Sequence, residues 1–271
     1  MTFIESVILA LIEGLTEFLP VSSTAHMIFA SSIAEIQDSP FTKMFQVSIQ
    51  FGAILAVVFL YWKKFFLETS LKFYLKLGFA VIPALVLGLF FDDMIESVLE
   101  KPVPIAIMLI AGGIVLLFID NFFKNPRIVN EESISFRKAI TIGFWQCLAM
   151  MPGTSRSAAS IIGGMQQGLS RKTAAEFSFF LAVPTMLAVT CYSIFLKDWK
   201  VNPKIELKGY EMILASKESL TYFLVGNAVA FIVAVLAIKF FIGILNKHGF
   251  KVWGWYRIAA GSLLLTYFLF F

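Results

Sequence analysis

The sequence predicts an all-α polytopic membrane protein: six transmembrane helices plus two re-entrant helix-loop-helix hairpins in an inverted-topology repeat. Of the 271 residues, 59% are hydrophobic and only 15% are charged, whereas soluble domains usually carry about 25% charged residues. Apolar segments of membrane-spanning length recur along the chain, and prolines interrupt two further ones. Because no alternating ten-residue pattern is present, helices rather than a β-barrel are expected to satisfy the backbone in lipid.

The composition also limits the kinds of partner. A net charge of +4 in a membrane protein indicates loop topology rather than affinity for nucleic acid, so no nucleic-acid partner is expected. No polar stretch exceeds about 25 residues, which is below typical domain size. We therefore expect residues 1–271 to form a single integral membrane domain.

Full spans need about 20 apolar residues. The candidates, in chain order, are Phe41–Trp62, Leu77–Phe91, Val103–Phe123, Phe177–Leu196, Leu220–Leu245 and Trp253–Phe271. Two more apolar segments, Phe3–Ile33 and Ala139–Met165, are interrupted at Pro20 and at Pro152-Gly153. Each half is too short to cross the membrane alone, so both segments are predicted to be re-entrant hairpins buried in protein or lining a wet cavity.

The two interrupted segments indicate an internal repeat. An offset of 132 residues pairs Pro20 with Pro152, Ser23 with Ser155 and Phe45 with Phe177. Each break is followed by three spans, an odd number, so the second half is expected to be upside down relative to the first. The predicted repeats are 1–125, with the hairpin 3–33, and 137–271, with the hairpin 139–168. In such repeats the site lies near mid-membrane, where the discontinuous segments meet.

Loop charges predict the orientation. The connections at 63–76, 124–138, 171–172 and 246–252 contain twelve lysines and arginines, whereas the opposite set has fewer and includes an acidic loop at 92–100. The positive-inside rule places the basic set in the cytoplasm. Both termini then face outward, and the first hairpin enters the membrane from the outer face.

The first broken segment carries paired carboxylates. Glu13 and Glu17 are four residues apart and project from one helix face. A charge at membrane depth costs on the order of 3 kcal/mol or more and usually faces a cavity. The two groups repel unless a cation lies between them or one is protonated. Oxygen ligands of this kind suit Mg²⁺ or Ca²⁺, and the alternative is a pair solvated by headgroup water.

Hydroxyl groups and a histidine follow Pro20. Ser22, Ser23 and Thr24 precede a new helical segment, where hydroxyls cap and backbone N–H groups bind anions. Capping alone accounts for one hydroxyl but hardly for three. His26 in isolation would be read as a buried core residue, but beside two glutamates and three hydroxyls it is predicted to be catalytic.

The second break places an arginine in an apolar hairpin. A guanidinium at this depth needs an anion or a carboxylate, and its planar fork suits a phosphate. The alternative is a structural pair between Arg156 and Glu13 or Glu17. The neighbouring candidates for substrate binding are Gly153, Thr154, Ser155 and Ser157, together with Gln50 on a separate helix. The set predicts phosphate chemistry in a membrane, but it does not distinguish cleaving a lipid phosphate from carrying it across.

The sequence resembles the undecaprenyl-diphosphate phosphatase family of bacterial membranes, also called bacitracin-resistance proteins. The resemblance covers nearly the whole chain and rests on ordered motifs: Glu-Gly-Leu-Thr-Glu-Phe-Leu-Pro-Val-Ser-Ser-Thr at 13–24, Ile-Gln-Phe-Gly-Ala-Ile-Leu-Ala at 49–56, Pro-Gly-Thr-Ser-Arg-Ser at 152–157 and Glu-Phe-Ser-Phe-Phe-Leu-Ala-Val-Pro at 176–184. There are departures from the family pattern: Ala25 stands where glycine is usual, Ser160 where threonine is common, and Gln46 where some members carry glutamate.

The resemblance implies hydrolysis of undecaprenyl diphosphate to the monophosphate and inorganic phosphate, which recycles the lipid carrier for peptidoglycan synthesis. It implies a multi-pass protein of the bacterial cytoplasmic (inner) membrane, with the active site opening to the outer, periplasmic side, and a divalent cation. Bacitracin would compete indirectly by sequestering the substrate. The oligomeric state, including a homodimer, is left open.

The expected roles combine both breaks. Arg156 and the cation would clamp the diphosphate, while Glu13 and Glu17 hold the cation or Glu17 orients the nucleophile. The hydroxyls of Ser22, Ser23, Thr24, Thr154 and Ser155 would cradle the phosphate, and Ser23 is also a catalytic candidate. His26 would be the general acid or base, or a covalent nucleophile, and the nucleophile stays open between water, a serine and His26. The alternative functions are a transporter or flippase for a polyprenyl phosphate lipid and, more weakly, a membrane scaffold.

Overall fold

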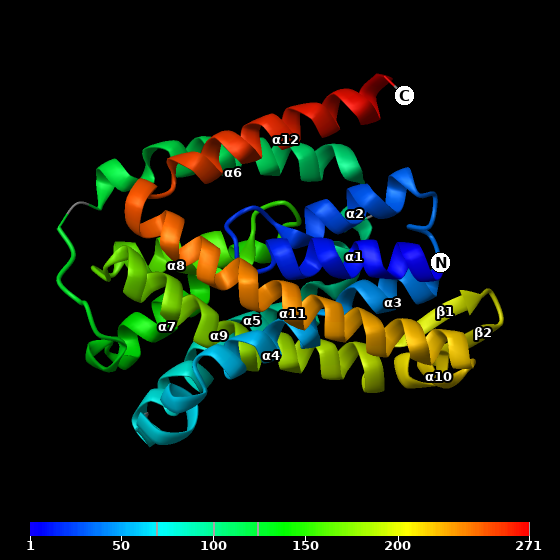
Figure 1. The fold of residues 1–271 in the computed structure, drawn as a ribbon, viewed down its shortest axis with the longest axis horizontal. Helices are drawn as coiled ribbons and strands as arrows, with labels where there is room; N and C mark the ends of the chain where they lie inside the picture. Colours follow the sequence, from blue (N-terminus) through cyan, green and yellow to red (C-terminus); the bar gives the residue numbers. More distant parts are fainter. Residues whose placement is uncertain (69, 100, 124, 271) are drawn as a thin grey trace.

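The computed structural model describes residues 1–68, 70–99, 101–123 and 125–270, and it is a layered bundle of helices (Figure 1). The α-helices are α1 (Phe3–Thr16), α2 (Ser23–Ile33), α3 (Pro40–Ser48), α4 (Gln50–Leu60), α5 (Leu71–Leu99), α6 (Pro102–Phe122), α7 (Phe136–Cys147), α8 (Arg156–Gln166), α9 (Arg171–Cys191), α10 (Gly209–Leu214), α11 (Lys217–His248) and α12 (Lys251–Phe270). Short 3₁₀ or π turns are η1 (Lys64–Glu68), η2 (Glu131–Ser133), η3 (Leu148–Met150) and η4 (Tyr192–Leu196).

Hydroxyl caps begin many of these helices. Thr2 and Glu5 form a reciprocal capping box at α1, and the side chains of Ser135, Ser170 and Ser216 accept backbone N–H groups at the starts of α7, α9 and α11. Each cap satisfies a donor that the first helical turn leaves free. The helix starts are therefore encoded locally, independently of the apolar runs that follow them.

Five helical segments of the described chain are long and apolar enough to cross a membrane. They are Pro40–Leu60, Leu71–Phe91, Pro102–Phe122, Arg171–Leu196 and Lys217–His248. They overlap the first five predicted spans, so an all-α polytopic membrane protein is confirmed. The sixth predicted span is the 20-residue helix α12, which is not among these five.

The connection between α9 and α11 contains a short β-hairpin, the only pair of strands in the part of the chain that the structure describes. Strands β1 (Asp198–Asn202) and β2 (Ile205–Lys208) pair antiparallel, with Asp198 opposite Lys208. The Lys208 Nζ lies 2.8 Å from Asp198 Oδ1. The hairpin lies between the predicted spans Phe177–Leu196 and Leu220–Leu245, so it is an addition to the predicted architecture.

Helix pairing is exchanged between the two halves of the chain. Helix α1, which precedes the first break, packs on α11 of the second half. Helix α7, which precedes the second break, packs on α5 of the first half. Both contacts are close at glycines, because a Cβ at Gly14 would lie 2.7 Å from the Ala230 carbonyl oxygen and one at Gly143 would overlap the Ala80 carbonyl oxygen. Helices α6 and α12 pair with each other (Figure 1).

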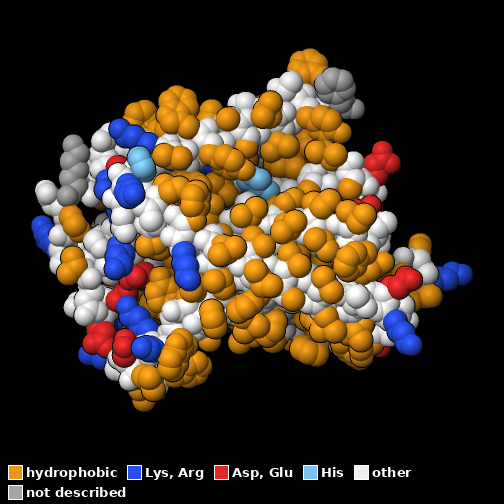
Figure 2. Space-filling model, viewed as in Figure 1, with side chains coloured by type: hydrophobic (Ala, Val, Ile, Leu, Met, Phe, Trp, Pro, Cys, Tyr) orange, Lys and Arg blue, Asp and Glu red, His pale blue; other side chains and the backbone are white. Residues whose placement is uncertain are grey.

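The two ends of the bundle differ. The termini and the β1–β2 hairpin lie at one end, and the connections α4–α5, α6–α7 and α11–α12 lie at the other (Figure 1). Lysine, arginine and acidic side chains gather chiefly at the second end, while hydrophobic side chains cover the middle of the same face (Figure 2). The connections at this end belong to the set that the sequence analysis assigned to the cytoplasm, whereas residues 92–99, predicted to be part of an acidic loop, are the last turns of helix α5.

Candidate functional site

The two helix breaks share an unusual backbone. Ser22 precedes α2 with φ 68°, and Ser155 precedes α8 with φ 75°. A left-handed φ is unfavourable for serine and often marks a functional site. Each side chain accepts a hydrogen bond from the backbone N–H three residues on, at 3.5 Å from Ala25 and 3.3 Å from Ala158. The two serines are 133 residues apart, so at the breaks Ser155 corresponds to Ser22, not to Ser23 as the 132-residue offset predicted.

Side chains of the second break contact the first. The Arg156 Nη2 lies 2.7 Å from Glu17 Oε1, and the Ser157 hydroxyl donates to the Leu19 carbonyl oxygen at 2.7 Å. On the other side of the carboxylate, the Ser23 hydroxyl donates to Glu17 Oε2 at 2.6 Å. Glu17, Ser23 and Ser157 are buried. The fold thus joins residues that are about 140 positions apart in the chain.

Arg156 is held but not saturated. Its Nη1 donates to the Ser178 carbonyl oxygen at 3.1 Å, and its guanidinium carbon lies 5.8 Å from the centre of the Phe18 ring. Its Nε is buried and has no hydrogen-bond partner in the described chain. The pairing with Glu17, which sequence reasoning offered as the structural alternative, is present, and it leaves Arg156 with a donor for a further acceptor.

Further buried polar atoms of this region also have no partner among the described residues. These atoms are both carboxylate oxygens of Glu13, the side-chain oxygen of Gln50 and the hydroxyl of Thr154. Glu13 is completely buried. Leaving a buried polar group unsatisfied costs about 1–3 kcal/mol, and more when it is charged. Their concentration in the two broken segments and at the start of α4 indicates a site for a polar ligand.

His26 lies between a backbone carbonyl and α12. Its Nδ1 is 2.8 Å from the Ser22 carbonyl oxygen, and its Nε2 is 2.8 Å from the Tyr256 hydroxyl. Because a carbonyl oxygen only accepts, Nδ1 carries the hydrogen in the neutral ring, and Nε2 accepts from the tyrosine. None of the hydrogen bonds in the described chain joins His26 directly to Glu17 or Arg156.

Arg257 of α12 is a site residue that sequence reasoning missed. It is fully buried, and each of its five N–H donors meets a backbone carbonyl oxygen. The acceptors are Leu109 at 3.1 Å, Pro20 at 3.2 Å, Thr154 at 3.0 Å, Met108 at 3.3 Å and Gly153 at 2.7 Å. Arg257 therefore ties both breaks to α6. The signal was available: an arginine within an apolar segment, the rule already applied to Arg156.

The remaining predicted residues occupy less informative positions. Gly153 has φ 91°, and a Cβ there would lie 2.5 Å from the Ile105 carbonyl oxygen, so the turn requires glycine. The Ser155 and Ser157 hydroxyls are 3.0 Å apart. Thr24 is half-buried, and its hydroxyl makes no hydrogen bond in the part of the chain that the structure describes.

The carboxylates provide a limited set of metal ligands. The described residues contain no group of three or more His, Cys, Asp or Glu side chains arranged to hold a metal. The two unpartnered oxygens of Glu13 fit a hard cation, whereas Arg156 and Ser23 already engage Glu17. A cation at Glu13 would take its other ligands from the remaining lone pairs of Glu17, from phosphate oxygens or from water.

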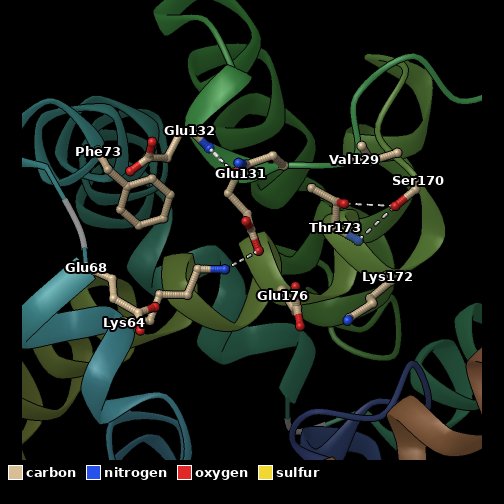
Figure 3. Close-up of a pocket in the computed structure, with 11 residues that line it drawn as sticks. Lys64, Glu68, Phe73, Val129, Glu131, Glu132, Ser170, Lys172, Thr173 and Glu176 are labelled. Atoms are coloured by element: carbon tan, nitrogen blue, oxygen red, sulfur yellow. Dashed lines mark hydrogen bonds and ion pairs between the residues drawn. The ribbon is translucent and has the colours of Figure 1, made fainter.

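A polar cavity of about 680 Å³ lies away from the breaks, at the end of the bundle that holds the α4–α5 and α6–α7 connections (Figure 3). Its lining includes Lys64, Glu131, Lys172 and Glu176, and the Lys64 Nζ lies 2.7 Å from Glu131 Oε1. Burial tends to raise the pKa of Glu131, but hydrogen bonds with Glu176 and Lys64 outweigh it and the pKa is lowered. None of the predicted site residues lines this cavity.

Known proteins match the chain over almost its full length. A family model described as bacitracin resistance protein BacA matches residues 6–263. Among curated proteins, the undecaprenyl-diphosphatase of Flavobacterium psychrophilum is 53% identical, covering 98% of this chain and 95% of its own. Those of Porphyromonas gingivalis and Persephonella marina are 46% and 45% identical, each covering 99% of this chain and 98% or more of their own. The chain therefore belongs to the family of BacA bacitracin resistance proteins.

Proposed function

We propose that this protein hydrolyses undecaprenyl diphosphate to undecaprenyl phosphate and inorganic phosphate. The full-length relatives carry the name of this activity, and the chain has the chemistry for it. The observation that carries the proposal is the contact between the two breaks, where Arg156 lies 2.7 Å from the buried Glu17. The reaction recycles the lipid carrier for cell-wall synthesis and accounts for bacitracin resistance.

The diphosphate is proposed to bind between the breaks. Arg156 would donate its unpartnered Nε–H and part of its guanidinium N–H groups to the phosphate. These donors would stabilise the negative charge that develops on the phosphate oxygens. The Ser23 and Thr154 hydroxyls, together with the backbone N–H groups at the start of α8, would contact the other oxygens. Glu17, freed in part from Arg156, would orient the attacking group.

His26 is proposed to move a proton at Nε2. The hydrogen bond from Nδ1 to the Ser22 carbonyl oxygen fixes the tautomer that leaves Nε2 as the acceptor. This arrangement suits a general base that takes a proton from water or a serine, and equally a histidine that attacks phosphorus itself. Acid-quench trapping with labelled substrate distinguishes the routes, because a phosphorylated His26 or serine excludes direct attack by water.

A divalent cation, Mg²⁺ or Ca²⁺, is proposed to bind at Glu13. Its two buried, unpartnered oxygens support this assignment, and Glu17 retains lone pairs that Arg156 and Ser23 do not use. When bound, the cation would neutralise charge on the diphosphate oxygens. Without the cation, Arg156 is the one positive side chain among the described residues that is paired with these two carboxylates, through Glu17.

We further infer six spans, two re-entrant hairpins in an inverted repeat, and an active site that opens to the outer face of the bacterial cytoplasmic membrane. The shared left-handed caps and the exchanged packing of α1 and α7 support the repeat. Both termini lie at the end of the bundle opposite to the charged one, which supports the orientation (Figure 1 and Figure 2). Cysteine accessibility in intact cells tests it: a cysteine at position 2 should react with an impermeant reagent, and one at position 247 should not.

Phosphate release from undecaprenyl diphosphate by the purified protein tests the main proposal. Arg156→Ala and Glu17→Ala should each lower kcat by at least about 100-fold, the scale of a lost transition-state donor. Arg137→Ala, at an exposed position at the start of α7, is the matched control and should retain activity. A chelator should abolish release, and added Mg²⁺ or Ca²⁺ should restore it. Full activity of Arg156→Ala would exclude this site.

The two-fold pattern of broken helices also favours a second candidate, transport of a polyprenyl phosphate lipid, because transporters use this architecture. Proteoliposomes distinguish the two. Movement of undecaprenyl phosphate between leaflets that persists in the hydrolysis-deficient Glu17→Ala variant would show a separate transport activity, and its absence would leave hydrolysis alone.

A further inference from the structure

Tyr256 of α12 contacts the half-buried ring of His26. Its hydroxyl lies 2.8 Å from His26 Nε2, and the two rings are stacked, with centroids 5.7 Å apart and planes at 11°. Tyr256 is 44% exposed. One residue therefore both hydrogen-bonds the imidazole at Nε2 and holds its own ring nearly parallel to it.

The direction of this hydrogen bond matters for reactivity. The Nδ1 hydrogen is donated to the Ser22 carbonyl oxygen, so the neutral ring has its only free lone pair at Nε2. The Tyr256 hydroxyl donates to that lone pair. In the proposed mechanism Nε2 either takes a proton or attacks phosphorus. It can do neither until its hydrogen bond with the Tyr256 hydroxyl is broken.

Helix α12 fixes the position of Tyr256. The next residue, Arg257, is anchored by five carbonyl oxygens from both breaks and α6, and the helix packs along α6. Tyr256 is exposed, as are the apolar side chains of Val252 and Trp255 on the same helix. A lipid diphosphate that approaches from the membrane would meet Tyr256 before it meets His26.

We propose that Tyr256 is a positioning residue that covers Nε2 of His26 and releases it when a lipid diphosphate enters from the membrane side. This inference rests on the proposed role of His26 in hydrolysis. It assigns α12 a part in the reaction beyond that of a membrane span.

The test is labelling of His26 by diethyl pyrocarbonate, which reacts with an imidazole nitrogen that has a free lone pair. The chain has only two histidines, and the exposed His248 is an internal reference within the same molecule. Mass spectrometry of the purified protein gives the ratio of His26 to His248 modification. Tyr256→Phe removes the hydroxyl and keeps the ring, and Tyr222→Phe on α11 is the matched control.

We expect Tyr256→Phe to raise the labelling ratio about fivefold, the factor that corresponds to one net hydrogen bond, and Tyr256→Ala to raise it further because the stacked ring is also lost. Tyr222→Phe should leave the ratio unchanged. An unchanged ratio in Tyr256→Phe, in protein that melts like the wild type, overturns the proposal.

Steady-state kinetics give a second readout. If substrate has to displace the tyrosine, Tyr256→Phe should lower KM for undecaprenyl diphosphate by up to about fivefold, whereas a residue that only supports packing would raise KM or lower kcat alone. A raised KM would contradict the cover. His26→Gln tests the proposed function separately from the proposal for Tyr256. Full activity in that variant would refute the proposed role of His26 in hydrolysis, whereas the labelling ratios of the Tyr256 variants would not change.

Discussion

Replacing Arg257 by lysine should separate the two breaks while keeping the charge. The arginine uses all five N–H donors on five backbone carbonyl oxygens, and a lysine ammonium has only three. At least two buried carbonyl groups would lose their donor, at about 1–3 kcal/mol each. The expected loss of about 2–6 kcal/mol is a large part of the roughly 5–15 kcal/mol that stabilises a typical protein.

Gly112→Ala should produce the same effect without changing the arginine. A Cβ at Gly112 would overlap Arg257 Nη2 and lie 2.6 Å from its guanidinium carbon. Gly243→Ala is the matched control, since a Cβ there meets nothing within 4 Å. In a helix interior this control should be neutral or stabilising by up to about 1 kcal/mol. The two glycines thus distinguish displacement of the guanidinium from a general effect of alanine.

The assays are thermal unfolding and phosphate release from undecaprenyl diphosphate, measured on the same preparations. Because a misplacement of about 1 Å can cost about 100-fold in rate, Arg257→Lys and Gly112→Ala should each lower kcat/KM by about that factor in protein that still folds. Their effects should be less than additive when combined, since both break one network. Wild-type activity and melting temperature in both variants would refute the idea that Arg257 holds the breaks together.

Three further outcomes are expected. Glu13→Gln should lower kcat at least about 100-fold and should abolish the rise in melting temperature that Mg²⁺ or Ca²⁺ gives the wild type, because an amide replaces the carboxylate ligand poorly. Ser157→Ala should cost about 1 kcal/mol and lower kcat/KM about tenfold through its lost bond to the Leu19 carbonyl oxygen, whereas Ser97→Ala, whose hydroxyl bonds only within its own helix, should do neither. Because the pKa of Glu131 is lowered on folding, the stability it contributes is fully present above its ordinary pKa and lost as pH falls through the lowered value. Melting curves of the wild type and Glu131→Gln should therefore converge in acid, and curves that stay parallel would contradict this sign.

The sequence predicts best what depends on short-range pattern. Hydropathy finds five apolar runs that the structure folds into helices long enough to cross a membrane, because each run must be able to reach across the bilayer by itself. The cost of a charge in lipid singles out Glu17 and Arg156, which the structure brings within 2.7 Å of each other. Pro20 and Pro152 mark both breaks. These inferences need no knowledge of how the helices pack.

The features that the sequence did not predict depend on long-range packing. The offset at the breaks is 133 rather than 132, because loop length is set by contacts across the fold and not by sequence identity between halves. The hairpin at 198–208 forms in a polar connection that carries no apolar signal. Tyr256 and Arg257 lie in a segment read as an ordinary span, and only the approach of α12 to the breaks gives either residue a role.

The two arginines show what a structure adds to an electrostatic argument. By sequence, Arg156 and Arg257 pose the same problem, a guanidinium in an apolar helix that requires a counter-group. The fold solves it differently. Arg257 has five carbonyl acceptors for five donors and is complete, while Arg156 leaves Nε without an acceptor and shares a carboxylate with a serine. A saturated guanidinium has nothing left to offer a substrate, so it holds the site, and the unsaturated one is the group that can meet a phosphate. The count of unmet donors, not the presence of the charge, therefore separates the structural arginine from the one proposed to bind substrate.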